Sequence, residues 1–398
     1  MRETTDILIS GGGVAGLTAA CAFGSAGFTV TCVDPEPPVT SAGAEGADLR
    51  TTAILAPSVA VLTAAGLWDA LKPYAAPLQV MRIVDAGGVT TEPRLSKSFD
   101  AAEISDAPFG WNLPNWLLRR EMVARLAALP NVSFRPGTGF QRLVTRRDEA
   151  LVTLSDGTQV AARLVIGADG RDSPLRAALG IGATTTRYGQ KALVFAVTHD
   201  QPHDNVSTEV HRTGGPFTLV PLPDQGGKPA SAVVWMDRGP RIAAFAALPV
   251  PAFETEMTAR SAGVLGALTL VSRRSVWPVI SQIAERMSAP RAVLMAEAAH
   301  VMPPIGAQGL NTSLADLACL LDLAGQHRSD PGAAAVTEGY HQRRHWDVRA
   351  RVTGIDLLNR ASMASLPVLR DLRAMALNAL YAAGPVRHGL MRTGLGLR

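Results

Sequence analysis

Cysteine, charge and long apolar runs are all scarce in this chain of 398 residues. Its three cysteines, Cys21, Cys32 and Cys319, are odd in number and scattered, so they indicate neither a disulfide framework nor a metal site. No apolar run reaches the roughly 18 residues that span a bilayer, and the chain enters an apolar strand too early for a secretion signal. Charged residues make up 18% and hydrophobic residues 47%, as in globular proteins. We expect a cytoplasmic protein with no metal, long enough for two domains around one large core.

Positive charge is concentrated at the C-terminal end. From residue 343 onward there are ten arginines and three aspartates, a balance of +7, whereas the whole chain carries +4. The pattern suits a helix on the anionic inner face of a membrane or on a partner protein; the alternative is a helix pair packed on the body with a solvated basic face. Nucleic acid is not an expected partner, because no binding motif or basic–aromatic array is present. The interleaved residues are Ile355, Leu357, Leu358, Met363, Leu366, Leu369, Leu372, Met375, Leu377 and Leu380 with Arg351, Arg360, Arg370 and Arg373.

A glycine-rich turn follows the first apolar segment, residues 6–10. Gly11 permits a tight turn, Gly13 lets the backbone approach a pyrophosphate, and Gly16 allows close packing of helix on strand. The helix that begins at Val14 and Ala15 directs unpaired N–H groups and the positive end of its dipole toward the phosphates. This G-x-G-x-x-G pattern predicts a dinucleotide site, although glycine runs also form ordinary βαβ turns.

An acidic residue at the expected distance supports the dinucleotide interpretation. Residues 29–33 form a second apolar strand that ends at Asp34, about 20 positions past the glycines, where a carboxylate accepts a hydrogen bond from a ribose 2′-OH. Further on, short β-like runs at 192–198, 206–211, 217–221 and 232–236 predict an antiparallel sheet inserted between parts of the nucleotide-binding fold.

Two later segments are not needed by a plain NAD domain, which makes a NAD dehydrogenase the weaker interpretation. A predicted strand at 164–166 leads into Gly167-Ala168-Asp169-Gly170, and another leads into Ala296-Glu297-Ala298-Ala299-His300. The second is followed by Pro303-Pro304-Ile305-Gly306-Ala307-Gln308-Gly309-Leu310-Asn311. We expect His300 to be structural, because it lies at a strand-to-loop junction with no acid or nucleophile opposite it.

With these motifs in this order, the chain resembles the single-component FAD aromatic hydroxylases of the para-hydroxybenzoate hydroxylase fold. Within that group it is most similar to the UbiH-type hydroxylases of ubiquinone biosynthesis, through Asp48-Leu49-Arg50, the segment from Gly214 to Leu222, and Tyr340-His341-Gln342-Arg343-Arg344. The resemblance covers essentially the full length. It implies an α/β fold: a GxGxxG FAD-binding Rossmann-like domain with an inserted antiparallel-sheet substrate domain and a C-terminal helical region. The implied boundaries are FAD-binding parts at 1–75, 111–180 and 286–330, substrate-domain parts at 76–110 and 181–285, and a basic helical part at 331–398.

The resemblance also implies a role for each matching position. FAD would be held by the glycine turn, by Asp34 on the adenosine ribose, by Arg50 along the cofactor, and by Arg120, or else Arg119, near the pyrophosphate or ribityl chain. Asp169 and Gly170 would serve both FAD and NAD(P)H, with Arg171 and Arg176 as electrostatic aids or surface residues. The loop that faces the flavin pyrimidine ring, together with the first residues of the helix that follows, would consist of Pro304, Gly306, Ala307, Gln308, Gly309, Leu310 and Asn311.

The third motif departs from the family pattern at several positions. Ala296 and Glu297 stand where Gly and Asp are usual, and Ala307 and Ser313 stand where Gly is usual. Glu297 keeps the carboxylate for a ribityl hydroxyl but is one methylene longer. We expect FAD to bind still, with altered affinity or movement.

The implied reaction is the hydroxylation of a phenolic ring. NADH or NADPH reduces FAD, O2 adds to give a flavin hydroperoxide, and its terminal oxygen reaches a lipophilic polyprenylated phenol. Phe195, Phe217 and Trp235 are candidate walls of the substrate site or else core residues, and no catalytic residue is assigned. Two alternatives remain: a FAD reductase or epoxidase of the same fold acting on an isoprenoid, and a non-catalytic flavoprotein scaffold. The basic tail would serve contact with a membrane or with other ubiquinone-biosynthesis proteins.

Overall fold

A largely parallel sheet forms one half of the molecule in the computed structural model, which describes residues 2–86, 94–363, 381–382 and 384–395. The strand order is β18-β19-β11-β1-β2-β8, and the neighbours from β19 to β8 run parallel. A β-ribbon continues from β11 through β10 to β9. The strands are β1 (Glu3–Ser10), β2 (Val30–Asp34), β8 (Val132–Pro136), β9 (Phe140–Thr145), β10 (Ala150–Leu154), β11 (Gln159–Gly167), β18 (Ser288–Ala289) and β19 (Ala292–Leu294).

Strand β1 lies in the middle of this sheet because its sequence can be buried on both faces. Ile7, Leu8 and Ile9 are all 0% exposed, as expected for a parallel strand between two layers. Helix α1 (Val14–Ser25) contacts β1, β2 and α4 (Asn115–Ala127). The expected strand–turn–helix at the glycines is thus confirmed.

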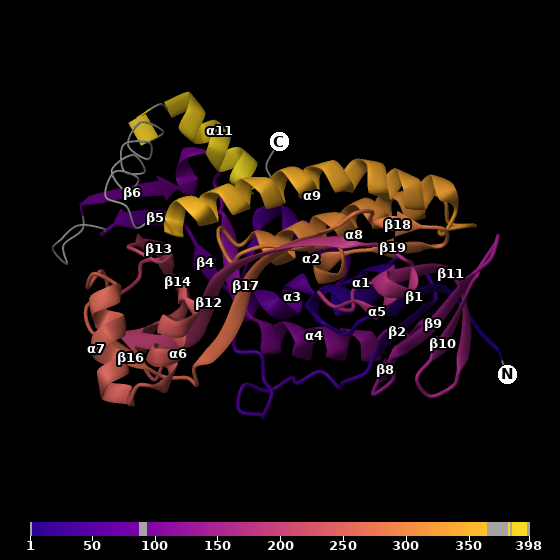
Figure 1. Ribbon diagram of the computed structural model, residues 1–398, viewed down its shortest axis with the longest axis horizontal. Helices are drawn as coiled ribbons and strands as arrows, with labels where there is room; N and C mark the ends of the chain where they lie inside the picture. Colours follow the sequence, from indigo (N-terminus) through magenta and orange to yellow (C-terminus); the bar gives the residue numbers. More distant parts are fainter. Residues whose placement is uncertain (1, 87–93, 364–380, 383, 396–398) are drawn as a thin grey trace.

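A long, mostly antiparallel sheet forms the other half (Figure 1). Its order is β20-β17-β12-β15-β14-β13-β5-β6, with β16 beside β12 and with β13 and β5 parallel. Strands from residues 80–100 therefore complete a sheet built mainly from residues 183–284. The strands are β5 (Val80–Asp85), β6 (Leu95–Asp100), β12 (Ala183–His199), β13 (Val206–His211), β14 (Pro216–Gln225), β15 (Lys228–Arg238), β16 (Leu268–Leu270), β17 (Ser275–Ala284) and β20 (His300–Val301).

The two faces of this second sheet have different partners. Helices α6 (Gly239–Ala247) and α7 (Val250–Arg260) cover one face and enclose a core of their own. On the opposite face, Ala192, Val194 and Met236 belong to the core that also holds β1 and α1. This opposite face, which we call the inner face, joins the sheet to the nucleotide-binding half.

The three aromatic residues considered for the substrate wall lie in the core beneath α6 and α7. Phe195, Phe217 and Trp235 are at most 1% exposed, and Trp235 stacks on Phe245 with ring centroids 4.4 Å apart. Their side chains point away from the inner face, because strand residues alternate between faces. The wall interpretation is therefore wrong, and the core interpretation is correct.

Smaller elements and a helical C-terminal region connect the two halves. A three-stranded antiparallel sheet has the order β3-β7-β4, and α9 runs along the upper side of the molecule in Figure 1, above α8. The elements are β3 (Thr51–Leu55), α2 (Ala56–Ala64), α3 (Trp68–Leu71), η1 (Lys72–Tyr74), β4 (Ala76–Leu78), η2 (Ala101–Glu103), β7 (Gly110–Pro114), α5 (Pro174–Ala178), η3 (Ala296–Ala298), α8 (Gln308–Gln326), α9 (Ala334–Met363) and α11 (Gly384–Leu395). The mixed α/β architecture with a helical C-terminal region is confirmed.

The predicted amphipathic tail is only partly described. Within α9, Ile355 is buried, whereas Leu357 and Leu358 are 69% and 59% exposed. Arg351 and Arg360 pair with Asp347 and Asp356. Leu366, Leu369, Arg370, Leu372, Arg373, Met375, Leu377 and Leu380 lie outside the described residues. Among the described helices, none combines the length and the apolar character needed to cross a bilayer.

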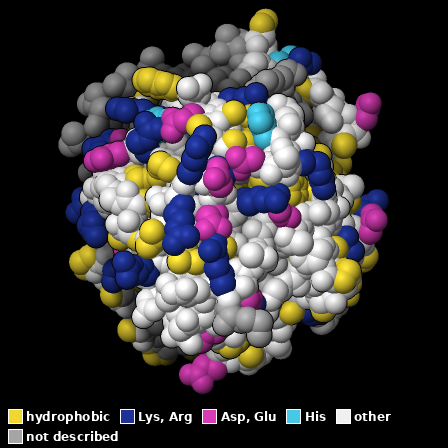
Figure 2. All heavy atoms as spheres, turned by 90° about the vertical axis from the view of Figure 1, so that its right-hand side faces the viewer, with side chains coloured by type: hydrophobic (Ala, Val, Ile, Leu, Met, Phe, Trp, Pro, Cys, Tyr) yellow, Lys and Arg dark blue, Asp and Glu magenta, His cyan; other side chains and the backbone are white. Residues whose placement is uncertain are grey.

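Charge on the end of the molecule at the right of Figure 1 is mixed. Figure 2 shows basic and acidic side chains interleaved there rather than one basic patch. Within the first sheet, Arg135 of β8 pairs with Glu3 of β1, and Arg163 of β11 pairs with Asp6 of β1.

Candidate flavin site

The glycine turn between β1 and α1 is shaped by close backbone approaches. Gly11 has φ +115°, and a Cβ there would lie 2.3 Å from the carbonyl oxygen of Ala168. A Cβ on Gly16 would lie 1.9 Å from the carbonyl oxygen of Gly11. Gly13 differs, because a Cβ there would meet nothing within 4 Å. Two glycines are therefore required by the protein itself, and the third leaves open space at the start of α1, beside Val14 and Ala15.

Asp34 reaches this turn from the end of β2. Its Oδ2 accepts a hydrogen bond from the N–H of Gly12, and its Oδ1 accepts one from Glu36 at 2.8 Å. The carboxylate thus lies beside the glycines, where the sequence predicts an acceptor for the ribose.

Asp169 connects the ends of two neighbouring strands. It accepts hydrogen bonds from the Ser10 hydroxyl at 3.1 Å, from the Ser173 hydroxyl, and from the Leu175 N–H at 3.1 Å. Burial raises the pKa of Asp169, and these hydrogen bonds oppose the rise. Gly170 follows with φ +87° and open space around its Cβ position. Asp169 therefore stabilises the start of α5 beside the glycine turn.

Arg50 is held between a carboxylate and an indole. Its guanidinium donates to Asp48 at 2.8 and 2.7 Å and lies over the Trp277 ring, 4.0 Å from the centroid. Asn115 donates to the same carboxylate at 3.0 Å. Burial alone would raise the pKa of Asp48, but the hydrogen bonds and charge of Arg50 hold it below its ordinary value. Since Trp277 belongs to β17, Arg50 spans the two halves of the molecule.

The two neighbouring arginines at the start of α4 lie in different surroundings. Arg119 is 4.0 Å from the Asp48 carboxylate, and its buried Nε has no hydrogen-bond partner among the described residues. Arg120 pairs with Glu121 at 2.7 Å and lies near the ring of Tyr74. The geometry favours Arg119 over Arg120 as the arginine for the cofactor, although the cofactor role of either stays a prediction.

The loop before α8 is fixed by Asn311. This side chain accepts from the Leu55 N–H at 2.9 Å and donates to the carbonyls of Ala53 at 2.7 Å and Ala307 at 2.6 Å. Gly306 has φ +62°, and Ala307, the N-cap of α8, has φ +56°. The Gln308 amide donates to the Gly306 carbonyl at 2.9 Å. The loop from Pro304 to Leu310 is thereby attached to β3, which follows Arg50.

Both alanines that replace usual glycines adopt left-handed backbone conformations. Ala296 has φ +54° and Ala307 has φ +56°, a region that favours glycine. The family preference for glycine at these positions therefore has a steric reason that still applies here. Glu297 faces Arg171 at 3.5 Å, and its negative charge adds to that of Asp48 in raising the pKa of Arg50.

His300 is structural, but the expectation that no acid lies opposite it is wrong. Its Nε2 is 2.6 Å from Oδ2 of Asp316 on α8, and both side chains are buried. Arg344 of α9 donates to the other oxygen of Asp316 at 2.8 Å. Burial would raise the pKa of Asp316, but His300 and Arg344 hold it below its ordinary value. This network joins β20, α8 and α9.

Helix α9 contacts both the loop and the second sheet. Arg351 donates to Gln308 at 3.1 Å, and the Tyr188 hydroxyl on β12 donates to Asp356 at 2.5 Å. Burial, followed by the hydrogen bond to Asp356, raises the pKa of Tyr188 to about 12. The helix therefore links the predicted flavin loop to the antiparallel sheet.

The residues brought together fit a bound FAD. The open space at Gly13 suits a pyrophosphate, and Arg119 Nε and Trp277 Nε1 are buried without hydrogen-bond partners within the described ranges. Sequence reasoning missed Asp48, Asn115 and Trp277 as parts of this network. The acid and the base two positions apart in Asp48-Leu49-Arg50 were a usable signal for Asp48. Trp277 has no such local signal.

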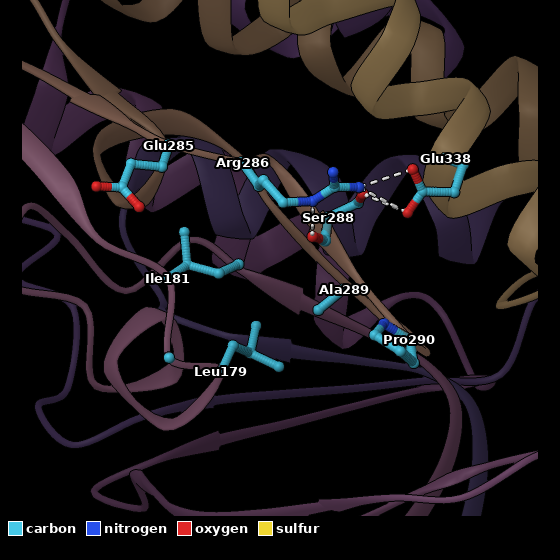
Figure 3. A pocket seen from close by; sticks show the side chains of 9 residues that line it. Leu179, Ile181, Glu285, Arg286, Ser288, Ala289, Pro290 and Glu338 are labelled. Carbon is cyan, nitrogen blue, oxygen red and sulfur yellow. Dashed lines mark hydrogen bonds and ion pairs between the residues drawn. The ribbon is translucent and has the colours of Figure 1, made fainter.

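A pocket elsewhere on the surface is separate from this site. It has a volume of about 400 Å³ and lies between the end of α5, the turn before β18, and α9. Figure 3 shows Arg286 paired with Glu338 at its side, while Glu285 points away from that pair. Its lining shares no residue with the predicted flavin set.

The Rossmann-like sheet, the glycine turn and the inserted antiparallel sheet define a FAD-dependent flavoprotein. The model of the FAD binding domain family matches residues 4–354. Ubiquinone hydroxylase UbiL of Rhodospirillum rubrum is 34% identical over 397 residues, covering 99% of this chain and 90% of that protein. The 3-demethoxyubiquinol 3-hydroxylase of Escherichia coli is 28% identical over 401 residues, covering 100% of both chains.

Solved structures show the same fold at low sequence identity. The p-nitrophenol 4-monooxygenase PnpA of Pseudomonas putida superposes with a TM-score of 0.79 at 19% identity, covering 100% of this chain and 99% of that one. PqsL of Pseudomonas aeruginosa in complex with 2-aminobenzoylacetate gives 0.76 at 22% identity, covering 91% and 98%. The chain belongs to the family of FAD-dependent aromatic hydroxylases, and it is a monooxygenase of that family.

Proposed function

We propose that this protein hydroxylates the ring of a polyprenylated phenol on the route to ubiquinone, with NADH or NADPH as reductant and O2 as oxidant. The observation that carries the proposal is the 34% identity with a ubiquinone hydroxylase over 397 residues. Full-length similarity matters here because both halves of the molecule, not the nucleotide-binding sheet alone, would have to contribute to the substrate site.

The described residues provide the parts that such an enzyme needs. The glycine turn would hold the pyrophosphate at the N-terminus of α1, with Asp34 on the ribose and Arg50 along the cofactor. Asp169 and Gly170 would border the cofactor at the next strand. The first turn of α8 would direct its positive dipole end at the pyrimidine ring, where reduced flavin carries negative charge.

Bound FAD would accept a hydride from NAD(P)H and activate O2 for transfer of one oxygen atom to the ring. The protein would position the two reactants and exclude water. The ring would lie at the inner face of the antiparallel sheet, beside the apolar side chains of Ala192, Val194 and Met236, which are buried in the shared core. We also propose that the basic C-terminal region meets the membrane surface, or other proteins of the pathway, from which a prenylated substrate would arrive.

Spectroscopy with product analysis tests the proposal. The purified protein should show oxidised-flavin absorption bands that bleach with anaerobic NADH or NADPH, faster when a prenylphenol is present. In air, mass spectrometry should find one oxygen atom from ¹⁸O2 in the phenol. An epoxide on the prenyl chain would instead support the epoxidase alternative. A protein that cannot be loaded with FAD would support a scaffold role.

A further inference from the structure

A carboxylate–imidazole pair lies on the inner face of the antiparallel sheet, outside the predicted flavin residues. Nε2 of His211 is 2.7 Å from Oε1 of Glu209, both on β13, and their side chains are only 13% and 7% exposed. The intervening Val210 points to the opposite core, with Phe217 and Leu219. Because strand residues alternate between faces, Glu209 and His211 share the inner face.

The pair belongs to a cross-strand row that leads toward Arg50. Glu209 is opposite Thr218, Thr218 is opposite Val234, and Val234 is opposite Val194. Three strand spacings separate the ends of this row, about 14 Å.

The far end of the row lies beside the cofactor network. Val194 is two residues from Ala192, which pairs with Trp277, the indole beneath Arg50. Thr218 and Val234, in the middle of the row, are only half-buried, so this part of the inner face is partly accessible.

One nitrogen of His211 is left for a ligand. Nε2 is engaged by the Glu209 carboxylate, which accepts a hydrogen bond and therefore sets the N–H on Nε2. Nδ1 is then the proton acceptor, and it is buried with no hydrogen-bond partner in the part of the chain that the structure describes. Because an unsatisfied buried acceptor destabilises a fold, we expect a bound ligand to donate a hydrogen bond to this atom.

We propose that His211 is a catalytic base for the phenolic substrate, oriented by Glu209, a role that rests on the proposed function. Nδ1 accepts the proton of the substrate hydroxyl, and the O–H electron pair stays on oxygen as phenolate. Glu209 stabilises the imidazolium, as the acid does in other acid–histidine pairs. The phenolate donates electron density to the ring carbon that is attacked. When the attacked ring carbon has gained its hydroxyl group, it loses its C–H proton to water and the ring regains aromaticity, and the imidazolium then returns its proton to the phenolate oxygen. These proton transfers require no further electrons.

Other charged side chains lie on the elements packed around His211. Asp85 is opposite His211 on β5, and Lys97 lies across from Ile83 on β6. Arg212 donates to the carbonyl of Ala86, and Arg260 donates to the carbonyl of Gly215. The pH dependence of the reaction therefore includes the influence of Asp85, Lys97, Arg212 and Arg260, besides that of Glu209.

The test compares His211→Gln and Glu209→Gln with His203→Gln in the FAD-loaded protein. His203 lies just before β13, where its Nε2 contacts the carbonyl of Leu222 at 3.1 Å, so it controls for loss of a histidine. With ortho-geranylphenol as probe, His211→Gln should lower kcat/KM for hydroxylation by about 100-fold or more, and Glu209→Gln should lower it less. In the wild type, kcat/KM should reach a plateau at a pH below the pKa of the free phenol, which is about 10. In His211→Gln this plateau should be absent, and kcat/KM should keep rising up to that pKa. His203→Gln should match the wild type.

A binding measurement separates this role from a structural one. Ultraviolet difference spectra of the oxidised wild-type protein with ortho-geranylphenol should show phenolate well below the pKa of the free phenol, and His211→Gln should bind it as neutral phenol. A ring-fluorinated analogue that is already ionised should restore the rate of His211→Gln. If the wild type binds neutral phenol, or if His211→Gln hydroxylates with an unchanged pH profile, the inference is overturned while the proposed function stands. If the wild type hydroxylates no phenol, the proposed function itself fails. If His211→Gln does not load FAD, the ultraviolet difference spectrum of the wild type alone tests the inference: bound phenolate supports it, and bound neutral phenol overturns it.

Discussion

Ala307 offers a direct test of the strain at the predicted flavin loop. Its φ of +56° places an L-residue in the left-handed region at the N-cap of α8, which costs about 1–2 kcal/mol relative to glycine. Glycine has greater freedom in the unfolded chain, which offsets about 0.5–1 kcal/mol of that gain. Ala307→Gly should therefore stabilise the protein by about 1 kcal/mol, although most alanine-to-glycine changes destabilise.

The matched control is Ala315→Gly, in the same helix and also half-buried. There the backbone is helical, and glycine should destabilise by about 1 kcal/mol. Urea unfolding followed by circular dichroism would then separate the two variants by about 2 kcal/mol. Thermal midpoints are less sensitive, because an unfolding entropy of about 2.1 cal/mol/K per residue makes 1 kcal/mol equal to only about 1 °C in a chain of this length.

The measurement should be made with and without FAD, because a bound ligand adds its own stabilisation. Relief of backbone strain in the protein itself predicts the same direction of change in both forms. A result in which Ala307→Gly destabilises as much as Ala315→Gly would refute the reasoning, because it would mean that the left-handed conformation carries no cost at this position.

Three further predictions concern the cofactor turn and the buried network. Gly13→Ala should fold normally but weaken FAD binding at least about 10-fold in a fluorescence titration, because its Cβ meets only the space open to the pyrophosphate. Gly16→Ala should fail to fold, since its Cβ would overlap the Gly11 carbonyl. Normal folding of Gly16→Ala would contradict this close approach. Arg344→Met should destabilise the protein by about 3 kcal/mol in urea, because the buried Asp316 carboxylate loses a partner; an unchanged midpoint would show that the pair contributes nothing. The pKa of Asp316 is lowered, so the contribution of this carboxylate to the stability of the fold is complete above its ordinary pKa of about 4 and is lost as pH falls through the lowered value. Ellipticity followed from about pH 7 to about pH 3 should therefore show acid unfolding at a higher pH in Arg344→Met than in the wild type. Coincident curves would count against the assignment.

Local patterns sufficed for the parts of the site that depend on neighbours in sequence. The strand before Gly11, the helix after it, and the placement of Asp34 and Asp169 at strand ends follow from spacing alone, because carboxyl ends of parallel strands meet at one edge. The short β-like runs between residues 192 and 236 were enough to predict the inserted antiparallel sheet.

Contacts between distant segments could not be predicted in the same way. Phe195 and Val194 are both apolar, so periodicity did not show which face of β12 meets the nucleotide-binding half. The contact of Trp277 with Arg50, and of Asp316 with His300, depends on how separate elements pack, and a single sequence has no local signal for either.

Helix α9 limits how far this protein can be shortened. A variant ending before residue 334 would keep every glycine of the cofactor turn, yet it would lose Arg344, Arg351 and Asp356, and with them the attachment of α8 and of the antiparallel sheet. The family match ends at residue 354, inside the helix and before Asp356, so a protein trimmed to that boundary would sever the link to Tyr188. A deletion series from the C-terminus should therefore lose folding abruptly within α9, and a fusion partner or affinity tag belongs beyond it.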